Sequence, residues 1–314
     1  MKIRYIWAAA FVIFIIFICF FTINSKYGLT KNVYLPLTAS KESNPLYQEI
    51  KERRSEFEIA PEDAYIDQVW KKTPGLNGKK VNIKKSFDNM KKEGVFNEKK
   101  LVFDPVRPQK SLEDLPASPI YRGHPDKEMV TFLINVSWGA EHIPSMLKTL
   151  KEKKVKANFF IEGKFAEKNP DLVKMIKEEG HIIGNHAYNH PDMSRMNSGE
   201  IQEQIERTNQ ILASLTDENP KWFAPPSGSY NDAVIETAAA LEMETVLWTV
   251  DTVDWKKPTK QVMVQRVVSK IHPGAMVLMH PTAVTAQSLG EMIEQISEKG
   301  LKINDIEALM SESR

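Results

Sequence analysis

Two histidines four residues apart are the first side chains in the sequence that could do chemistry together. His186 and His190 lie in the string GNHAYNHP, residues 184–191, directly after a short apolar run that begins at His181. If that run is a strand, the loop that leaves it presents both imidazoles together, and two imidazoles at this spacing can bind one metal ion. The alternative is two ordinary polar histidines in a turn. The elements around the pair must decide between these interpretations.

A regular alternation of short apolar strands and helix-length segments begins at Met129. We expect strands at residues 129–136, 157–161, 181–184, 222–224, 244–250, 275–279 and 301–303. The helix-length segments are residues 143–153, 165–179, 199–215, 231–241, 259–271, 285–299 and 305–310. Seven strand–helix pairs predict a parallel sheet closed into a barrel, although periodicity alone leaves an open doubly wound sheet as an alternative.

Polar residues follow several of these expected strands, at the rim where strand–helix barrels place their chemistry. The strings are NVSWG at 135–139, the histidine string, APPSG at 224–228, WTVDTVDW at 248–255 and LMHP at 278–281. The sequence contains no GxGxxG string and no P-loop, so nothing supports a nucleotide site.

The composition limits the classes of partner. The chain has 314 residues, of which 42% are hydrophobic and 26% charged, which is typical of one large globular domain plus a smaller one. The net charge of +1 implies no polyanion, so we expect no nucleic acid partner. The single cysteine, Cys19, excludes an intramolecular disulfide.

The amino-terminal segment predicts a membrane anchor. Residues 6–23 are apolar apart from one threonine, and about 18 helical residues span roughly 27 Å, close to a hydrocarbon core. A cleaved signal peptide is the alternative, but no A-x-A site follows the run. Lys2 and Arg4 favour a cytoplasmic amino terminus, although Lys26 and Lys31 on the far side weaken this preference. We therefore expect a single-pass protein of the cell membrane with an extracytoplasmic body.

The domain organisation follows from these segments and from the composition between them. We expect a cytoplasmic tip and anchor at 1–26, a polar stalk at 27–60, a small α+β module at 61–108, a Pro-rich linker at 109–127 and the barrel at 128–314. No motif in the small module carries chemistry. Its role stays open between a spacer, a dimer contact and a wall-binding surface.

The order and spacing of the rim strings resemble the polysaccharide deacetylases that contain a NodB homology domain. The resemblance covers roughly residues 129–303 and includes KANFFIEG at 156–163 and GH at 180–181. It implies a deformed (β/α)7 barrel that removes acetyl groups from cell-wall glycan, the N-acetylglucosamine or N-acetylmuramic acid of peptidoglycan. Over the wider sequence the chain is similar to membrane-anchored, deacetylase-like proteins of spore-forming bacteria, which implies a role in sporulation.

The resemblance also implies roles for single residues. In the family, two histidines and an aspartate hold a metal whose bound water is the nucleophile, and a second aspartate is the base. His186 and His190 match the metal histidines, His280 matches the histidine that protonates the amine, and Asp254 matches the aspartate that tunes it. The residues that match the substrate pocket are Trp138, Pro226, Tyr230, Trp255 and Leu278.

Three residues depart from the family pattern. Ser137 stands at the base position, Trp138 at the position of the metal aspartate, and Ala224 at that of the arginine that holds the base. The changes fit one another, because an arginine left without its carboxylate would be a buried unpaired charge that costs about 3–5 kcal/mol. Glu141 is the nearest acidic residue that a different alignment would offer instead.

Two functions follow from this incomplete set. Without the aspartate, His186 and His190 predict weak or absent binding of zinc or another divalent metal. Trp138 is expected to be a buried plug in the ion's place, with a stacking face for a sugar ring as the alternative. Asp254 and His280 are alternatively a pair kept for packing. The chain is then either a glycan deacetylase with a weakened site or a pseudoenzyme that binds wall glycan or partner proteins.

Overall fold

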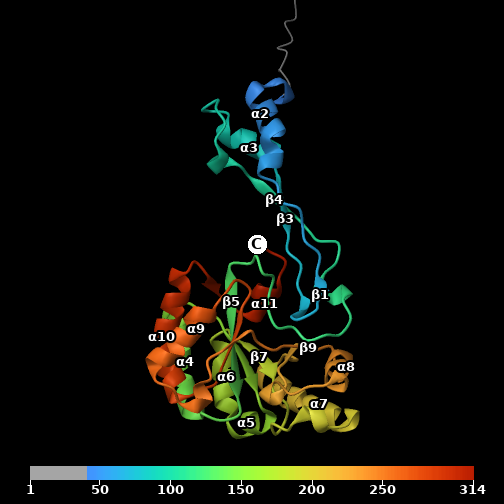
Figure 1. Cartoon of the computed structure of the whole chain (residues 1–314), viewed down its shortest axis with the longest axis vertical. Helices are drawn as coiled ribbons and strands as arrows, with labels where there is room; N and C mark the ends of the chain where they lie inside the picture. Colours follow the sequence, from blue (N-terminus) through green and yellow to red (C-terminus); the bar gives the residue numbers. More distant parts are fainter. Residues whose placement is uncertain (1–40) are drawn as a thin grey trace, which may run out of the picture. The chain divides into compact units, whose positions relative to one another are not determined.

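The computed structural model describes residues 41–314 (Figure 1). The predicted anchor, residues 6–23, lies outside the described residues. Within residues 41–314, no helix combines the length and apolar character needed to cross a membrane. The described chain forms two compact units, one of residues up to 53 together with 83–101, and one of residues 54–82 together with 102–314.

The first unit is a small helical body. Its elements are η1 Lys41–Ser43, α2 Pro45–Arg53, α3 Ile83–Met90 and η3 Glu98–Lys100. Ile50 of α2 and Met90 of α3 are fully buried, and the rings of Tyr47 and Phe87 meet edge to face with 5.7 Å between their centroids. The segment expected as a polar stalk at 27–60 therefore contains an amphipathic helix, α2, and α3 lies within the expected small module.

The second unit begins with two antiparallel strand pairs. β1 Tyr65–Asp67 pairs with β2 Lys71–Thr73, and β3 Gly78–Val81 pairs with β4 Phe103–Val106. A side chain on Gly78 would place its Cβ 2.4 Å from the Ile59 carbonyl oxygen, so this close approach of two backbones requires glycine. Short 3-10 turns, η2 Arg54–Glu56 and η4 Leu112–Asp114, complete this part of the chain.

A curled parallel sheet forms the body of the second unit, and its longest strand is the buried interior strand β5 Met129–Val136. The sheet order is β10-β11-β5-β6-β7-β8-β9, and β12 pairs with the start of β5. The other strands are β6 Asn158–Ile161, β7 Ile182–Asn185, β8 Trp222–Phe223, β9 Glu244–Thr245, β10 Val250–Asp251, β11 Met276–Met279 and β12 Lys302–Ile303. The predicted strand–helix architecture is confirmed as a curled parallel sheet.

Helices cover the outer face of this sheet (Figure 1). They are α4 Ile143–Glu152, α5 Gly163–Lys168, α6 Pro170–Glu178, α7 Ser198–Thr216, α8 Asp232–Ala240, α9 Lys260–Lys270 and α10 Ala283–Glu298, whereas α11 Ile306–Met310 packs on the inner face. Alternate residues of β5 enter two cores, as the period of a strand requires. Phe132 and Ile134 pack in the core that includes α4, α9 and α10, whereas Leu133 packs inside the curl with Ile306 and Leu309 of α11.

The expectation of one strand at 244–250 is wrong, because this segment is split into β9 and β10. No ladder joins β9 to β10 in the described residues, so the strands alone do not close the ring. Residues before β5 fill the gap: the Ile120 N–H donates to the Thr245 carbonyl, and the Leu247 N–H donates to the Ile120 carbonyl. Arg122 forms a further bridge with Ala275. Part of the predicted Pro-rich linker is thus a piece of the sheet.

The single helix expected at 165–179 is also two helices. α5 ends at Lys168, Asn169 is non-helical, and Pro170 begins α6. Proline has no N–H to donate, and the first residue of a helix needs none because its N–H has no partner within the helix. A helix that begins at Pro170 therefore loses no backbone hydrogen bond there.

Candidate functional site

The carboxyl end of β7 places the two histidines. Asn185, its last residue, donates from its buried amide to the Ile205 carbonyl and accepts from the Ala187 N–H. A Cβ on Gly184 would lie 2.5 Å from the Phe160 ring, so only glycine lets β7 pack this closely on β6. Ala187 and His190 both have φ near +58°, at 58° and 57°, and these left-handed residues shape the loop.

His186 and His190 lie side by side, as the sequence predicts. Their ring centroids are 5.2 Å apart at an interplanar angle of 70°. His186 Nδ1 lies 2.7 Å from the Ala224 carbonyl and donates to it, which leaves Nε2 with a free lone pair. Burial, aided by the neighbouring His190, lowers the pKa of His186 to about 3, so it is neutral at pH 7. His190 is exposed.

Asp254 and His280 form a tight pair across the rim. His280 Nδ1 donates to Asp254 Oδ1 at 2.8 Å, and the His280 backbone N–H donates to Oδ2 at 2.6 Å. The Thr285 hydroxyl also donates to Oδ2, at 2.8 Å. Burial acts to raise the pKa of Asp254, but these hydrogen bonds and the charge of His280 outweigh it and hold the pKa below its ordinary value. The carboxylate therefore fixes the tautomer and the orientation of His280.

A strained turn aims Asp254 at this histidine. Val253, directly before it, has φ of +52°, a conformation that costs a β-branched residue about 1–3 kcal/mol. The Asp251 carboxylate accepts from the Val253 N–H at 2.7 Å and holds the turn. Asp251, the last residue of β10, thus stabilises the turn that follows this strand. Thr285 was missed in the sequence, although its place at the start of α10, three residues after the N-cap Thr282, was a signal.

Trp138 is the main difference from expectation. The predicted buried plug is wrong, because the side chain is 48% exposed. Its indole lies parallel to the His280 ring, with 5.9 Å between centroids and an interplanar angle of 10°. The turn after it is fixed by Gly139, since φ is +78° there and a Cβ would lie 2.0 Å from the Pro281 carbonyl oxygen. The ring therefore forms an exposed aromatic surface beside His280.

The remaining two departures, at Ser137 and Ala224, supply no carboxylate that could bind a metal together with His186 and His190. The Ser137 hydroxyl is buried and has no hydrogen-bond partner within the described residues, while Ala224 is buried with its backbone bonded to Asn185 and His186. Glu141 does not replace the missing groups: its side chain is 73% exposed and lies 3.6 Å from His142. Residues 41–314 contain no group of three or more His, Cys, Asp or Glu that could hold a metal ion. The residues present therefore do not fit a tight metal site.

The predicted pocket residues occupy different depths of the rim. Pro226 and Leu278 are buried, whereas Trp255 is 55% exposed with Lys256 Nζ 4.8 Å from its ring centroid. The Tyr230 hydroxyl lies 2.9 Å from that of Tyr121, a contact that the sequence did not indicate. Burial, with this hydrogen bond, raises the pKa of Tyr121 above its ordinary value. Trp138 and Trp255 are thus the aromatic surfaces that this rim offers to solvent.

The curled parallel sheet and the histidines at its rim define a class of protein. They form the scaffold of a metal-dependent hydrolase, in which the set of side chains that would bind the metal is incomplete. A profile of the family described as polysaccharide deacetylase matches residues 122–246. YlxY, an uncharacterized protein of Bacillus subtilis, is 51% identical over 287 residues, which are 91% of this chain and 89% of that protein. The chain belongs to the polysaccharide deacetylase family.

Two further relatives bear on the site. A peptidoglycan-N-acetylglucosamine deacetylase of Bacillus cereus is 35% identical over 55% of this chain and 65% of that protein. The crystal structure of BA3943 from Bacillus anthracis, described as a CE4 family pseudoenzyme, covers 86% of this chain and 96% of that chain with a TM-score of 0.82 and 48% identity. A mutant of BA3943 is described as having restored enzymatic activity.

Proposed function

We propose that this chain is a non-catalytic member of the peptidoglycan deacetylase family that binds cell-wall glycan at the carboxyl rim of its sheet. The observation that carries the proposal is Trp138, which places an exposed aromatic face on His280 where the resemblance places the metal aspartate. Aromatic faces are common surfaces for binding because they bury a large area at low entropic cost. Trp255 provides a second such face on the same rim.

The missing carboxylates argue against hydrolysis. Deacetylases of this family are generally metal-dependent, and amide hydrolysis by such a site needs both a held metal and a base. With Ser137 and Trp138 in place of the two aspartates, we expect weak or absent zinc and little or no acetate release. The similarity to a pseudoenzyme structure supports this proposal.

The second candidate is a deacetylase with weakened activity. It is favoured by the pair Asp254–His280, whose three hydrogen bonds to one carboxylate keep the histidine oriented although no reaction requires it in the first proposal. Zinc content and turnover separate the two candidates. Stoichiometric zinc after dialysis, together with acetate release above roughly 1 s⁻¹ from N-acetylglucosamine oligomers, would establish the second.

Glycan binding has its own test. Chitohexaose should bind to the 314-residue chain in a calorimetric titration, and Trp138→Ala should weaken binding about tenfold, as loss of a central aromatic contact does. Met175→Ala is the matched control, because Met175 is 40% exposed on α6. Equal affinity of the Trp138 variant and the control variant would show that the glycan does not stack on Trp138.

We also propose that residues 6–23 anchor the protein in the cell membrane, with the body outside the cytoplasm. The apolar run of the sequence and its basic flank support this, and the similarity to anchored proteins of spore-forming bacteria supports a role in sporulation. Edman sequencing of protein from the membrane fraction should return the original amino terminus. A start at residues 24–27 would mean a cleaved signal peptide.

A further inference from the structure

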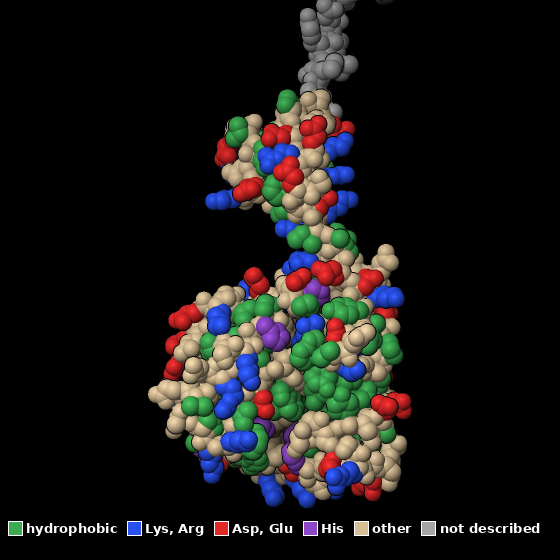
Figure 2. Space-filling view, viewed as in Figure 1, with side chains coloured by type: hydrophobic (Ala, Val, Ile, Leu, Met, Phe, Trp, Pro, Cys, Tyr) green, Lys and Arg blue, Asp and Glu red, His purple; other side chains and the backbone are tan. Residues whose placement is uncertain are grey.

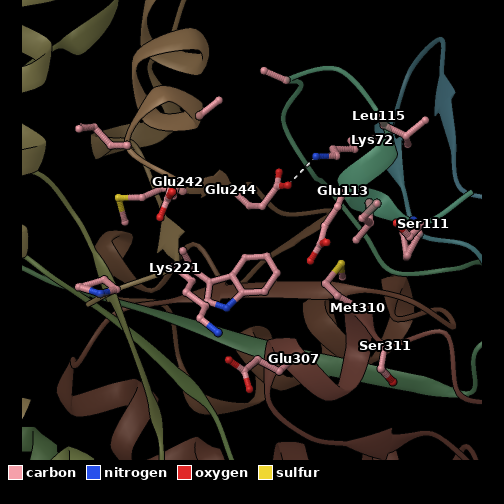
Figure 3. A pocket seen from close by; sticks show the side chains of 18 of the residues that line it. Lys72, Ser111, Glu113, Leu115, Lys221, Glu242, Glu244, Glu307, Met310 and Ser311 are labelled. Carbon is pink, nitrogen blue, oxygen red and sulfur yellow. Dashed lines mark hydrogen bonds and ion pairs between the residues drawn. The ribbon is translucent and has the colours of Figure 1, made fainter. Parts of the chain in front are cut away.

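A large groove lies at the amino ends of β8 and β9, the opposite edge of the sheet from the histidines. Its volume is about 1060 Å³, at the upper end of ordinary ligand sites. One wall comes from the barrel, including Lys221, Glu242 and α11. The other comes from the segments before the barrel, including Lys72 of β2 and Leu115 (Figure 3). The segments before the barrel thus supply one wall of a groove that the barrel alone would lack.

The groove continues into a second hollow of about 470 Å³. The two hollows share residues 219–222 and Glu307, so they form one elongated depression. In the space-filling view, hydrophobic side chains gather on the same face, around the position of β9 (Figure 2). The apolar lining residues include Leu112, Leu115, Leu241, Met243 and Met310. This shape suits an extended chain better than a compact molecule.

The charges around the apolar lining are mostly negative. Lys72 and Glu244 neutralise one another in an ion pair of 2.5 Å, with Lys72 3% exposed (Figure 3). Four further carboxylates line the groove and have no ion-pair partner within residues 41–314, and they belong to Glu113, Glu242, Glu307 and Glu312. Lys221 is the remaining cation of the lining. A ligand with positive charges would therefore match the groove.

Trp222 supplies an observation that does not depend on these charges. It lines both hollows and is 8% exposed, and its buried indole N–H has no acceptor in the described chain. An unsatisfied buried donor costs about 1–3 kcal/mol, and an oxygen from a ligand would relieve that cost. With only 8% of the residue exposed, Trp222 offers little stacking surface for a sugar, in contrast to Trp138 and Trp255 on the other rim.

We propose that this groove binds a basic, partly apolar peptide segment of a protein partner. Lysine or arginine side chains of the peptide pair with Glu113 and Glu307, its apolar side chains cover the lining, and a main-chain carbonyl accepts from the Trp222 N–H. A peptide supplies all three features, whereas a glycan lacks the apolar side chains. The chain would then hold glycan at one edge of its sheet and a protein at the other.

The test is a calorimetric titration of the 314-residue chain with an acetylated, amidated hexapeptide that alternates lysine and leucine. We expect it to bind at least about tenfold more tightly than the matching glutamate–leucine peptide, and we expect 0.5 M salt to reduce the difference. The double variant Glu113→Gln/Glu307→Gln should lose about tenfold in affinity, roughly threefold for each exposed pair. Glu298→Gln, an exposed glutamate on α10 outside the groove, is the matched control.

A second variant tests the indole donor without removing the ring. Trp222→Phe should weaken the lysine peptide about threefold while leaving the chain folded, as judged by circular dichroism. The proposal is overturned if both peptides bind equally, or if the double variant binds like Glu298→Gln. It is also overturned if a hexamer of glucosamine binds in this groove in preference to the peptide, because the partner would then be a cationic glycan.

Discussion

At Trp138 a single side chain changes both the charge and the shape of the rim. The resemblance places a metal-binding aspartate there, and the structure has a half-exposed indole stacked on His280. The neighbouring His186 is buried and its Nδ1 donates to the Ala224 carbonyl, so the tautomer leaves the Nε2 lone pair free to bind a metal. Much of a metal site is therefore in place although no carboxylate completes it.

Trp138→Asp is expected to create zinc binding. The aspartate adds a charged ligand to His186 and His190, and because the indole is exposed, its removal leaves little cavity in the core. Zinc titration followed by dialysis should show close to one bound ion in the variant and much less in the wild type. Trp138→Ala is the control, because it removes the indole without adding a carboxylate ligand. Equal zinc content in the aspartate and alanine variants would show that position 138 does not face the histidines.

Adding Ser137→Asp and Ala224→Arg to Trp138→Asp is expected to give acetate release from chitooligosaccharides. The new base should contribute about 10²–10⁴-fold over the zinc-binding single variant, and the arginine keeps that base ionised. His280→Ala in the triple variant should lower the rate again. The restored activity described for a mutant of the related BA3943 is in line with this expectation. A folded, zinc-loaded triple variant without acetate release would argue against these assignments.

The sequence identified which side chains meet at the rim but not how Trp138 is placed. His186, His190, Asp254 and His280 follow from strings at strand ends, since the ends of parallel strands meet at one edge. The orientation of an indole depends on what packs behind it, here Gly139 and the Pro281 carbonyl from a loop about 140 residues away in the sequence. Local patterns carry no information on such a contact.

Among the elements, the junction of β6 and β7 contains a buried titratable group. The Ala157 N–H donates to His181 Nδ1 at 3.2 Å, and the ring packs on Phe159 with 5.3 Å between centroids. Burial, with the nearby Lys156, lowers the pKa of His181 from 6.5 to about 4. Between about pH 4 and pH 6.5, His181 is therefore neutral in the folded state and protonated in the unfolded chain.

His181→Asn is expected to reduce the acid sensitivity of the fold. Because the folded pKa is depressed, the stability from this group is complete above pH 6.5 and is lost as pH falls toward 4, by up to about 3 kcal/mol. The asparagine keeps an acceptor for Ala157 but does not titrate. Urea unfolding at pH 7 and pH 4.5 should show a smaller drop in the free energy of unfolding for the variant than for the wild type. An equal drop in both proteins would show that His181 does not cause the acid sensitivity.

Most elements of the barrel were predictable because their signals are local. β5 is a continuous apolar run, and α7 begins with a reciprocal capping box between Asn197 and Glu200. The segment 244–250 was predicted as one strand because its apolar pattern is continuous. Its break depends on Ile120, whose backbone pairs with Thr245 and Leu247 from far away in the sequence. Pairing with a distant residue leaves no local signature.

At the scale of the molecule, the segment around Ile120 covers what would otherwise be an open edge at β9. A fragment of residues 118–314 should therefore be a soluble monomer, whereas residues 128–314 should aggregate and unfold at lower temperature. The shorter fragment loses a fully buried isoleucine, about 1.5–3 kcal/mol, and exposes an unpaired strand edge. Size-exclusion chromatography and thermal unfolding compare the two. Equal behaviour would mean that the barrel needs no residues before 128.

The pairing of β5 also constrains when the protein can fold during its synthesis. The ribosome delivers residues 129–136 early, and β6 follows within about 30 residues, but the other neighbours of β5 are residues 276–279 and 302–303. The side of β5 that pairs with β11 stays without a partner until residues 276–279 have been made. A nascent chain can therefore pair β5 with β6 and β7 but cannot complete the native sheet before residues 276–279 are available. We expect a chain truncated before residue 276 to lack the complete sheet and to form no stable body.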